Sequence, residues 1–331
     1  MINLCIKDIE VYLPENVITN DFFGEELLRT KNKMFLGTKE RRHIGRDDKA
    51  SDHMHICAQR LIENNNLNVK DIDMIVTNVS CPDEVFTGSG AVLNKRINGN
   101  ARHIFDIHNT GCVSFIYMLD LVKTYMMVHN VKSALVCNSQ TAAGRVFAQP
   151  DTRQLAQACI PGDGTSVAYI TNEPLNTVNH IKLENFPDSA EDMYVNCGGA
   201  KYWEARTTSG SIDFTEEKSS TIMTRGNSLV PKMIYDACAS AKIKTTQISY
   251  LITNQPNPIF LRNWREATLL PPERHLDTFE KYANLFGAGI PITLAENMKK
   301  GTFKNGDIIC LAGFAHAGDF AAACLISWGA N

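Results

Sequence analysis

The chain contains an internal repeat, and this repeat restricts the possible folds more than any other feature of the sequence. Residues 71–78 form a run rich in isoleucine and valine that ends on Thr-Asn, and residues 247–254 repeat the pattern with the same ending 176 residues later. The same offset carries Gly111 onto Gly287, and each glycine stands in a polar turn before an apolar helix. Two copies of one strand–helix arrangement in a common register predict two half-domains related by a pseudo-two-fold axis.

Strand-like and helix-like segments alternate through both copies. We expect strands at residues 2–13, 72–78, 104–107, 133–137, 166–170, 247–254 and 307–312, and helices at 54–62, 91–97, 112–127 and 229–241 and after Gly287. Residues 172–225 are polar and predict an irregular connection with one or two strands. The alternation is typical of an α/β fold, in which loops that follow the strands converge on one site. We expect the half-domains to cover residues 1–171 and 172–331.

Cys112 is the strongest candidate for a chemical role. It follows Gly111 at the start of an apolar helix, where free backbone N–H groups and the helix dipole stabilise a thiolate. Such a helix start also offers N–H donors to an oxyanion. The position therefore predicts a nucleophile that carries acyl groups as a thioester. The alternative is a buried structural cysteine, since the chain has ten cysteines.

Composition excludes several classes of protein. A net charge of −3 gives no electrostatic footprint for nucleic acid, and 44% hydrophobic with 21% charged residues fits a globular protein. We find no secretory signal and no apolar run of the ~18 residues that span a membrane. The cysteines are scattered without a C-x-x-C pair, which favours a reducing cytoplasm and predicts no metal site. The closest pair of histidines, His53 and His55, fits a helix start better than a metal site.

Short motifs in a fixed order connect the chain to a known family. They are Tyr12-Leu13-Pro14, residues 36–42, Gly111-Cys112, Gly162-Asp163-Gly164, Asn254-Gln255-Pro256-Asn257, Asn284 and Gly313-Phe314. In this order and spacing they resemble the thiolase superfamily, and within it the β-ketoacyl-ACP synthase III-like (KAS III-like) group. The resemblance spans nearly the whole chain and implies a five-layered αβαβα fold with two pseudo-two-fold-related half-domains. It also implies a homodimer formed along the sheet edge of the first half-domain.

The same resemblance implies a catalytic trio of cysteine, histidine and asparagine. Cys112 and Asn284 match the first and third members, but Asn254 occupies the position of the histidine. An asparagine can donate hydrogen bonds but cannot act as a base near pH 7, so ordinary decarboxylative chain elongation is not expected. His316 aligns with a glycine of the family whose N–H completes an oxyanion hole. We expect His316 to supply the missing base, with Asp319 orienting it; the alternative is a histidine that only shapes the pocket.

The donor site differs from the family as well. Relatives that use coenzyme A clamp its adenine between a tryptophan and an arginine, and the corresponding residues are Lys31 and Phe35. Arg41 and Arg42 are expected to contact a phosphate or an acidic carrier protein, unless residues 39–43 form only a solvated loop. The donor is therefore expected to be acyl-CoA or an acyl carrier protein, with no tightly bound cofactor.

Together these features predict a cytoplasmic acyltransferase of specialised or fatty-acid-related biosynthesis. Cys112 would accept the acyl group, the backbone N–H groups of Cys112 and His316 would hold the oxyanion, and Asn254 and Asn284 would position substrate. A small-molecule acceptor would then take the acyl group. Two alternatives remain: a condensing enzyme that forms a C–C bond, and a non-catalytic subunit of a heterodimer. No nucleic acid or membrane is expected as a partner.

Overall fold

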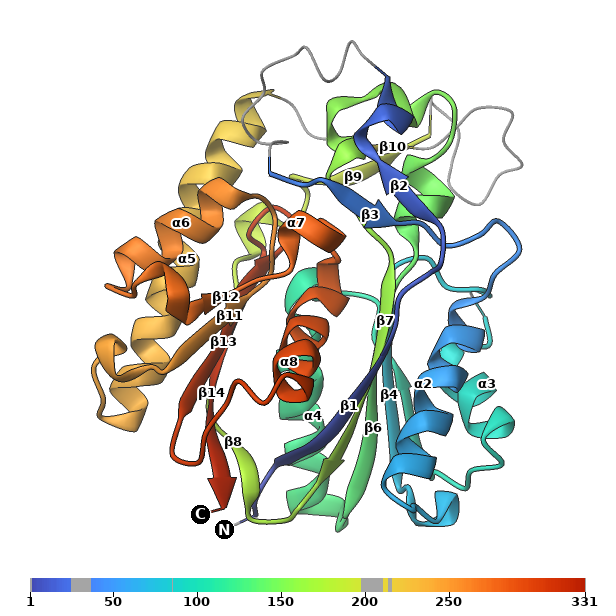
Figure 1. Ribbon diagram of the computed structural model, residues 1–331, viewed down its shortest axis with the longest axis vertical. Helices are drawn as coiled ribbons and strands as arrows, with labels where there is room; N and C mark the ends of the chain where they lie inside the picture. The colour runs from blue at the N-terminus through green and yellow to red at the C-terminus, as the bar shows by residue number, and fades with distance from the viewer. Residues whose placement is uncertain (1, 25–36, 85, 198–210, 214–215, 331) are drawn as a thin grey trace.

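The main sheet has ten strands in one continuous order. In the computed structural model, which describes residues 2–24, 37–84, 86–197, 211–213 and 216–330, this order is β12-β11-β13-β14-β8-β1-β7-β6-β4-β5 (Figure 1). The strands of its first half are β1 (Cys5–Tyr12), β4 (Met74–Val79), β5 (His103–Asp106), β6 (Ser133–Gln140) and β7 (Gly164–Thr171). Those of its second half are β8 (Leu175–Asn185), β11 (Tyr250–Thr253), β12 (His275–Leu276), β13 (Ile308–Ala315) and β14 (Phe320–Ala330).

The two halves of the sheet repeat one topology. β5, β4 and β6 run parallel, and β7 and β1 follow antiparallel. In the same way β12, β11 and β13 run parallel, and β14 and β8 follow antiparallel. The two halves join where β1 pairs with β8. This contact is short and antiparallel, and it consists of one residue pair, Cys5 with Thr177. This repetition confirms the predicted pseudo-two-fold arrangement.

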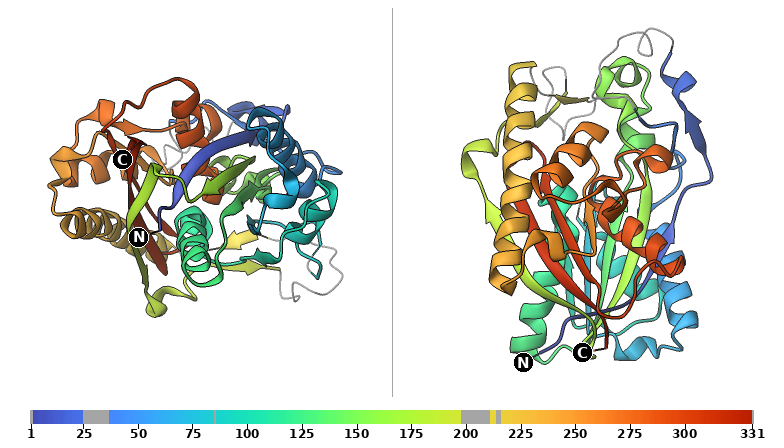
Figure 2. Two further views of the ribbon diagram at one scale, coloured as in Figure 1. Left: turned by 90° about the horizontal axis from the view of Figure 1, so that it is seen from below. Right: turned by 60° about the vertical axis from the view of Figure 1, so that its left-hand side comes forward.

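Helices divide the molecule into five layers. α4 (Ser114–His129) and α8 (Gly289–Lys299) lie between the two halves of the sheet (Figure 1). α2 (Ala50–Asn64) and α3 (Ser89–Arg96) cover the outside of the first half, and α5 (Glu216–Ala241) and α6 (Pro258–Ala267) cover the outside of the second (Figures 1 and 2). Separate apolar clusters fill the central layer and the two outer interfaces. The predicted αβαβα layering is therefore present.

The remaining elements are small. Two short hairpins are formed by β2 (Val17–Thr19) with β3 (Glu40–Arg42) and by β9 (Tyr194–Asn196) with β10 (Ser211–Asp213). α7 (Phe279–Tyr282) is a single turn. Single 3₁₀ turns, Gly111–Val113 and Phe286–Ala288, precede α4 and α8 in corresponding places.

α4 is apolar on nearly all sides, which explains why the segment Gly111–His129 is long and apolar enough to cross a membrane. Half of the segment is buried inside the protein, however, and Phe115, Ile116 and Leu119 are wholly buried in the central cluster. A helix that lies between the two halves of the sheet needs apolar residues on most of its sides. The composition of α4 therefore follows from its central position.

Residues 172–225 are more regular than the predicted connection with one or two strands. β8 is a regular strand of 11 residues that pairs with β14 along its length, and α5 begins at Glu216 rather than near residue 229. Polar residues on the less buried part of β8, such as His180 and Lys182, hid its strand pattern, because only part of its surface faces a core. Residues 320–330, for which no strand is predicted, form β14, in which small residues alternate poorly with large ones because most of the strand is buried. The boundary between residues 171 and 172 falls between β7 and β8 and stays a prediction.

Candidate active site

Cys112 lies in a tight turn at the start of the central helix α4. The turn Gly111–Val113 is preceded by Thr110 with φ of 67°, and Gly111 itself has φ of 34°. A Cβ atom on Gly111 would lie 2.9 Å from Nε2 of His316. Glycine is therefore needed here both for its backbone conformation and for the close approach of the imidazole ring.

A cavity of about 400 Å³ opens beside Cys112. Cys112, Asn254, Asn284 and His316 all line it, so the structure brings together the four predicted catalytic residues. Much of the remaining wall is apolar and comes from both halves of the chain: Ala142, Val146, Phe147, Ile160, Met193, Val195, Ile212, Ile222, Met223, Phe260, Phe286 and Phe314. A cavity with a few polar groups and otherwise apolar walls suits the chain of an acyl group.

Asn254 follows β11 and is held by both ends of its amide. Its Nδ2 donates to the carbonyl oxygen of Phe314 at 3.0 Å, and its Oδ1 accepts from the N–H of Phe314 at 3.3 Å. The same side chain hydrogen-bonds the sulfur of Cys112. Asn254 thus ties the nucleophile to β13, and its amide has no capacity to accept a proton as a base.

Asn284 lies before the turn that leads into α8. Its Oδ1 accepts from the N–H of Phe286 at 3.0 Å, while its backbone bonds to Ile160 and Gly162 across the cavity wall. No hydrogen bond within the described part of the chain uses its Nδ2. The side chain is therefore fixed in place with two N–H donors available to a substrate.

His316 and Asp319 form a bonded pair at the end of β13. Nδ1 of His316 lies 3.1 Å from Oδ1 and 3.0 Å from Oδ2 of Asp319, whose side chain is buried. If Nδ1 carries the proton and donates it to this carboxylate, Nε2 on the opposite side of the ring is left as an acceptor. Nε2 faces Gly111, the neighbour of Cys112. The turn also holds His316 at φ of 49°, an uncommon conformation for a residue other than glycine.

The thiol of Cys112 is harder to ionise than the sequence suggested. Burial raises the pKa of Cys112 to about 12, and the negative charge of Asp319 adds to the rise, while the hydrogen bond from Asn254 lowers it. The expectation of a stabilised thiolate at the helix start is not met, because desolvation is the largest influence on the pKa of this thiol. At neutral pH the sulfur is a thiol and needs a base to become a nucleophile.

The residues predicted to bind the donor differ in their exposure to solvent. Arg41 is wholly buried, and its guanidinium donates to Oδ1 of Asn20 at 2.8 Å and to the carbonyl oxygen of Cys159 at 2.8 Å. The expectation that Arg41 contacts a phosphate is corrected: its charge is enclosed and its N–H groups link the β2–β3 hairpin to the rest of the protein. Arg42 is partly exposed, and its role stays a prediction. Phe35 and Lys31 lie outside the described residues.

Sequence reasoning missed other residues of the cavity. His108, four residues before Cys112, lines the cavity and is exposed, and no pattern in the sequence assigned it a role. Gln140, the last residue of β6, also lines the cavity and is only 2% exposed. A polar residue at the end of a buried parallel strand is the signal that could have revealed Gln140, since such strand ends converge on the site.

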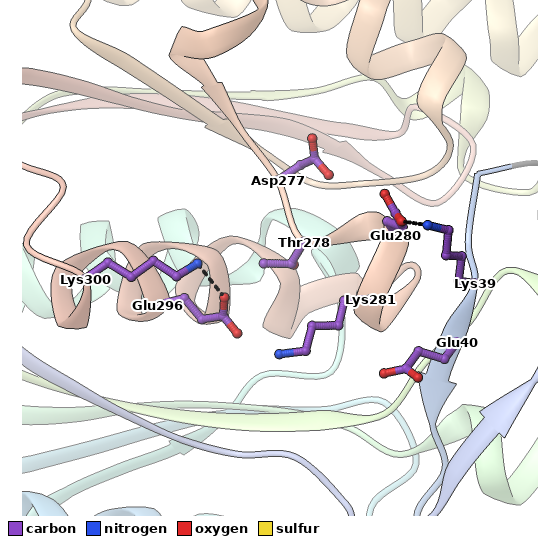
Figure 3. Close-up of a pocket in the computed structure, with 8 residues that line it drawn as sticks. All are labelled: Lys39, Glu40, Asp277, Thr278, Glu280, Lys281, Glu296 and Lys300. Atoms are coloured by element: carbon purple, nitrogen blue, oxygen red, sulfur yellow. Dashed lines mark hydrogen bonds and ion pairs between the residues drawn. The ribbon is translucent and has the colours of Figure 1, made fainter.

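A second cleft, of about 490 Å³, lies apart from Cys112 and shares no residue with its cavity. It is lined by Lys39, Glu40, Asp277, Thr278, Glu280, Lys281, Glu296 and Lys300 (Figure 3). Lys39 pairs with Glu280, and Lys300 with Glu296 at 3.2 Å (Figure 3). This cleft is lined mainly by charged side chains, two pairs of which bond to each other, and it contains no cysteine or histidine, so the Cys112 cavity is the better candidate for chemistry.

Comparison with known proteins gives two family matches. Residues 3–186 match the family described as FAE1/type III polyketide synthase-like protein, which is more than half of the chain. Residues 238–328 match the family described as 3-oxoacyl-(acyl-carrier-protein (ACP)) synthase III C terminal. The two matches together cover both halves of the sheet.

Individual relatives agree with these matches. A β-ketoacyl-(acyl-carrier-protein) synthase III of Fusobacterium nucleatum is 26% identical over 323 residues, which is 95% of this chain and 95% of the relative. The crystal structure of 3-oxoacyl-(acyl-carrier-protein) synthase III from Aquifex aeolicus is similar with a TM-score of 0.82 and 21% identity, over 99% of this chain and 100% of that chain. OleA of Xanthomonas campestris is similar with a TM-score of 0.82 and 16% identity, over 99% and 98% of the two chains. These similarities confirm the fold class predicted from the sequence.

Proposed function

This chain belongs to the KAS III-like group of the thiolase superfamily, and on that premise we propose that it transfers acyl groups through a thioester on Cys112. The donor is an acyl thioester of coenzyme A or of an acyl carrier protein. The acceptor is a small molecule with an alcohol, amine or carbon nucleophile. No tightly bound cofactor is needed, and a cytoplasmic location fits the dispersed cysteines.

The observation that carries this proposal is the hydrogen bond between His316 and Asp319. It holds the imidazole with Nε2 against the turn of Cys112, where a base is required. The raised pKa of Cys112 makes that base necessary at neutral pH. The pair thus supplies what the asparagine at position 254 cannot.

The proposed reaction has two transfers. Nε2 of His316 takes the proton of the Cys112 thiol, and the sulfur attacks the carbonyl carbon of the donor thioester. The N–H groups of Cys112 and His316 hold the resulting oxyanion. The C–S bond of the donor then breaks, and its thiol leaves with the proton from His316. In the second transfer His316 takes a proton from the acceptor, which attacks the acyl-Cys112 carbonyl. The bond between the acyl carbon and the Cys112 sulfur then breaks, and the sulfur takes the proton from His316 to become a thiol again.

Asn254 and Asn284 act as donors in this scheme. The N–H groups of Asn284 that the protein leaves available suit a thioester carbonyl, and Asn254 orients the sulfur. Asn254 also separates this proposal from ordinary chain elongation. Ordinary elongation passes through the enolate that forms when a malonyl group loses carbon dioxide. Position 254 holds an asparagine in place of a histidine, and an amide cannot act as a base in that reaction.

A condensing reaction is the second candidate, and the names of the relatives favour it. The Fusobacterium nucleatum relative is named a β-ketoacyl-(acyl-carrier-protein) synthase III. A condensing enzyme releases carbon dioxide from a malonyl thioester, whereas transfer to an alcohol or amine does not. Release of carbon dioxide in step with consumption of acyl-Cys112 would therefore identify the condensing reaction.

A homodimer is part of the proposal. β5 is an edge strand of the main sheet in the first half of the chain. Such an edge can pair with its equivalent in a second copy and extend the sheet through both subunits. Sedimentation in solution would measure the oligomeric state directly.

Intact-mass measurement tests the chemistry. The protein is incubated with a panel of acyl-CoA and acyl-carrier donors, and the mass of the chain is followed with time. We expect a gain equal to one acyl group that is absent in Cys112→Ala and slower by about 100-fold or more in His316→Ala. No adduct that depends on Cys112 with any donor would favour the non-catalytic subunit.

A further inference from the structure

Gln140 carries a buried amide that the protein does not satisfy. Its side chain is 2% exposed and lines the cavity of Cys112. Neither Nε2 nor Oε1 makes a hydrogen bond with the described part of the chain. A buried amide without partners is costly, so an unpaired one in a binding cavity points to a ligand group that completes it.

Neighbouring polar side chains in the cavity wall are already paired. Oγ of Ser139 lies 2.7 Å from Oγ1 of Thr165, and Nε2 of Gln157 donates to the carbonyl oxygen of Ile212 at 3.3 Å. Both Ser139 and Gln157 line the same cavity as Gln140. Gln140 differs in this respect from Ser139, its neighbour on β6, and from Gln157, the other glutamine of the cavity.

The position of Gln140 relates it to the acyl chain. Residues two apart on a strand share a face, and Asn138 on this face donates to Oγ of Ser114 at 2.8 Å. Ser114 begins α4 two residues after Cys112, so Gln140 lies on the face of β6 that is turned to the nucleophile's helix. The chain after Gln140 then supplies apolar wall residues, including Val146 and Phe147. An acyl chain that starts at Cys112 and follows this wall would pass Gln140.

We propose that Gln140 selects acyl groups whose chain carries a hydroxyl or amide substituent. The inference rests on the proposed acyl transfer through Cys112 and names the substrate class of that site. The amide of Gln140 has an acceptor and two donors, and a hydroxyl or amide substituent can both donate to and accept from it. A straight alkyl chain would cover the amide of Gln140 without forming a hydrogen bond to it. The unpaired amide would then disfavour binding of the straight-chain donor.

The test compares pairs of donors in the acylation of Cys112. Each pair consists of a straight-chain acyl-CoA and acyl-CoAs of the same length with a hydroxyl on the β, γ or δ carbon. Rates of adduct formation are measured by intact mass for the full-length protein, for Gln140→Met and for Gln157→Met. Methionine keeps the length of the side chain and removes its hydrogen bonds, and Gln157 is a matched glutamine in the same cavity that has its own partner.

We expect the wild-type protein to prefer at least one hydroxyacyl donor by about 10- to 100-fold over its straight-chain partner. Gln140→Met should bring this ratio close to one, and Gln157→Met should keep it. A wild-type protein that acylates at equal rates with both members of every pair would overturn the inference, even if Gln140→Met does not fold, while leaving the proposed function intact. No adduct from any donor would overturn the proposed function and the inference with it. Equal loss of the ratio in both variants would also overturn the role of Gln140.

Discussion

Nδ1 of His316 lies 3.0 Å from Oδ2 of Asp319, a carboxylate that is itself buried. The two are three positions apart in sequence, and the turn between β13 and β14 brings them together. The carboxylate orients the ring and stabilises the imidazolium that forms once Nε2 has taken a proton. Asp319 is therefore a positioning residue that acts through His316.

Replacing Asp319 by asparagine should slow acylation of Cys112 by about 10- to 100-fold, because the ring loses the charge that stabilises its protonated form. The pH–rate profile should also shift toward lower pH, because the negative charge of Asp319 raises the pKa of Cys112 and the variant lacks it. Intact-mass measurements on samples quenched at set times between pH 6 and pH 9 would record the lower acylation rate and the shifted profile. Asp188→Asn, an exposed residue away from the cavity, is the control. An unchanged profile in Asp319→Asn would contradict the role of the pair.

Gly111→Ala should impair catalysis more than its cost in stability explains. The new Cβ would meet Nε2 of His316 at 2.9 Å, so the imidazole must move. Gly301, at φ of 64° with nothing within 4 Å of the corresponding Cβ position, is a matched control for backbone strain alone. Both variants should lose about 1–2 kcal/mol of stability from the left-handed conformation. Only Gly111→Ala should lower the acylation rate, and equal rates in the two variants would show that the contact with His316 is unimportant.

Asn254→Asp should damage the site although the two side chains have the same shape. The variant loses the N–H donors that reach Phe314 and the sulfur, and it places a carboxylate against a carbonyl oxygen 3.0 Å away. We expect a loss of about 1–3 kcal/mol in stability and a fall in acylation rate of at least tenfold, since a second negative charge opposes the thiolate. Denaturant unfolding and intact mass would measure the two effects. Asn263→Asp, a partly buried asparagine at the surface of α6, is the control, and similar losses there would argue against a specific role of Asn254.

The sequence was informative where local pattern and tertiary role coincide. The repeat at 176 residues predicted both copies of the strand–helix unit, because each buried parallel strand reads as an apolar run. Cys112, Asn254 and His316 could be grouped because each follows a strand, and strand ends meet in this class of fold, while Asn284 could be added because the repeat places its turn in correspondence with that of Cys112. These four residues of the cavity were thus within reach of the sequence, whereas Gln140 was not recognised.

Properties that depend on the burial of a side chain could not be predicted from the sequence. The ionisation of Cys112 was misjudged because the sequence shows the helix start but not the desolvation that opposes it. Arg41 reads as a surface cation, and only the packing of the β2–β3 hairpin shows that it is enclosed. The missing hydrogen bonds of Gln140 likewise exist only in three dimensions. In each case the deciding term is the distance of a polar group from water, which no local pattern encodes.

Two buried histidines should make the protein sensitive to acid. Burial lowers the pKa of His43 and of His275 to about 4 from an ordinary value of 6.5. Between these values the unfolded chain binds more protons than the folded one, so stability falls as the pH drops from 6.5 toward 4. Each histidine should contribute a loss on the order of 3 kcal/mol at pH 4. Asp163 works in the opposite direction, because burial raises its pKa to about 7 and acid then favours the folded state.

A variant isolates the histidine contribution from such opposing groups. His43 packs edge-on against Phe22 and Phe23 at 5.6 and 6.4 Å between ring centroids, and its Nε2 has no hydrogen-bond partner. His43→Phe therefore fits an apolar site and removes one titrating group. Urea unfolding from pH 7 to pH 4 should show a shallower loss of stability in the variant, with the difference from wild type growing below pH 6.5 and approaching 3 kcal/mol, to order of magnitude, at about pH 4. Parallel stability curves for the two proteins would mean that His43 is not desolvated in the folded state.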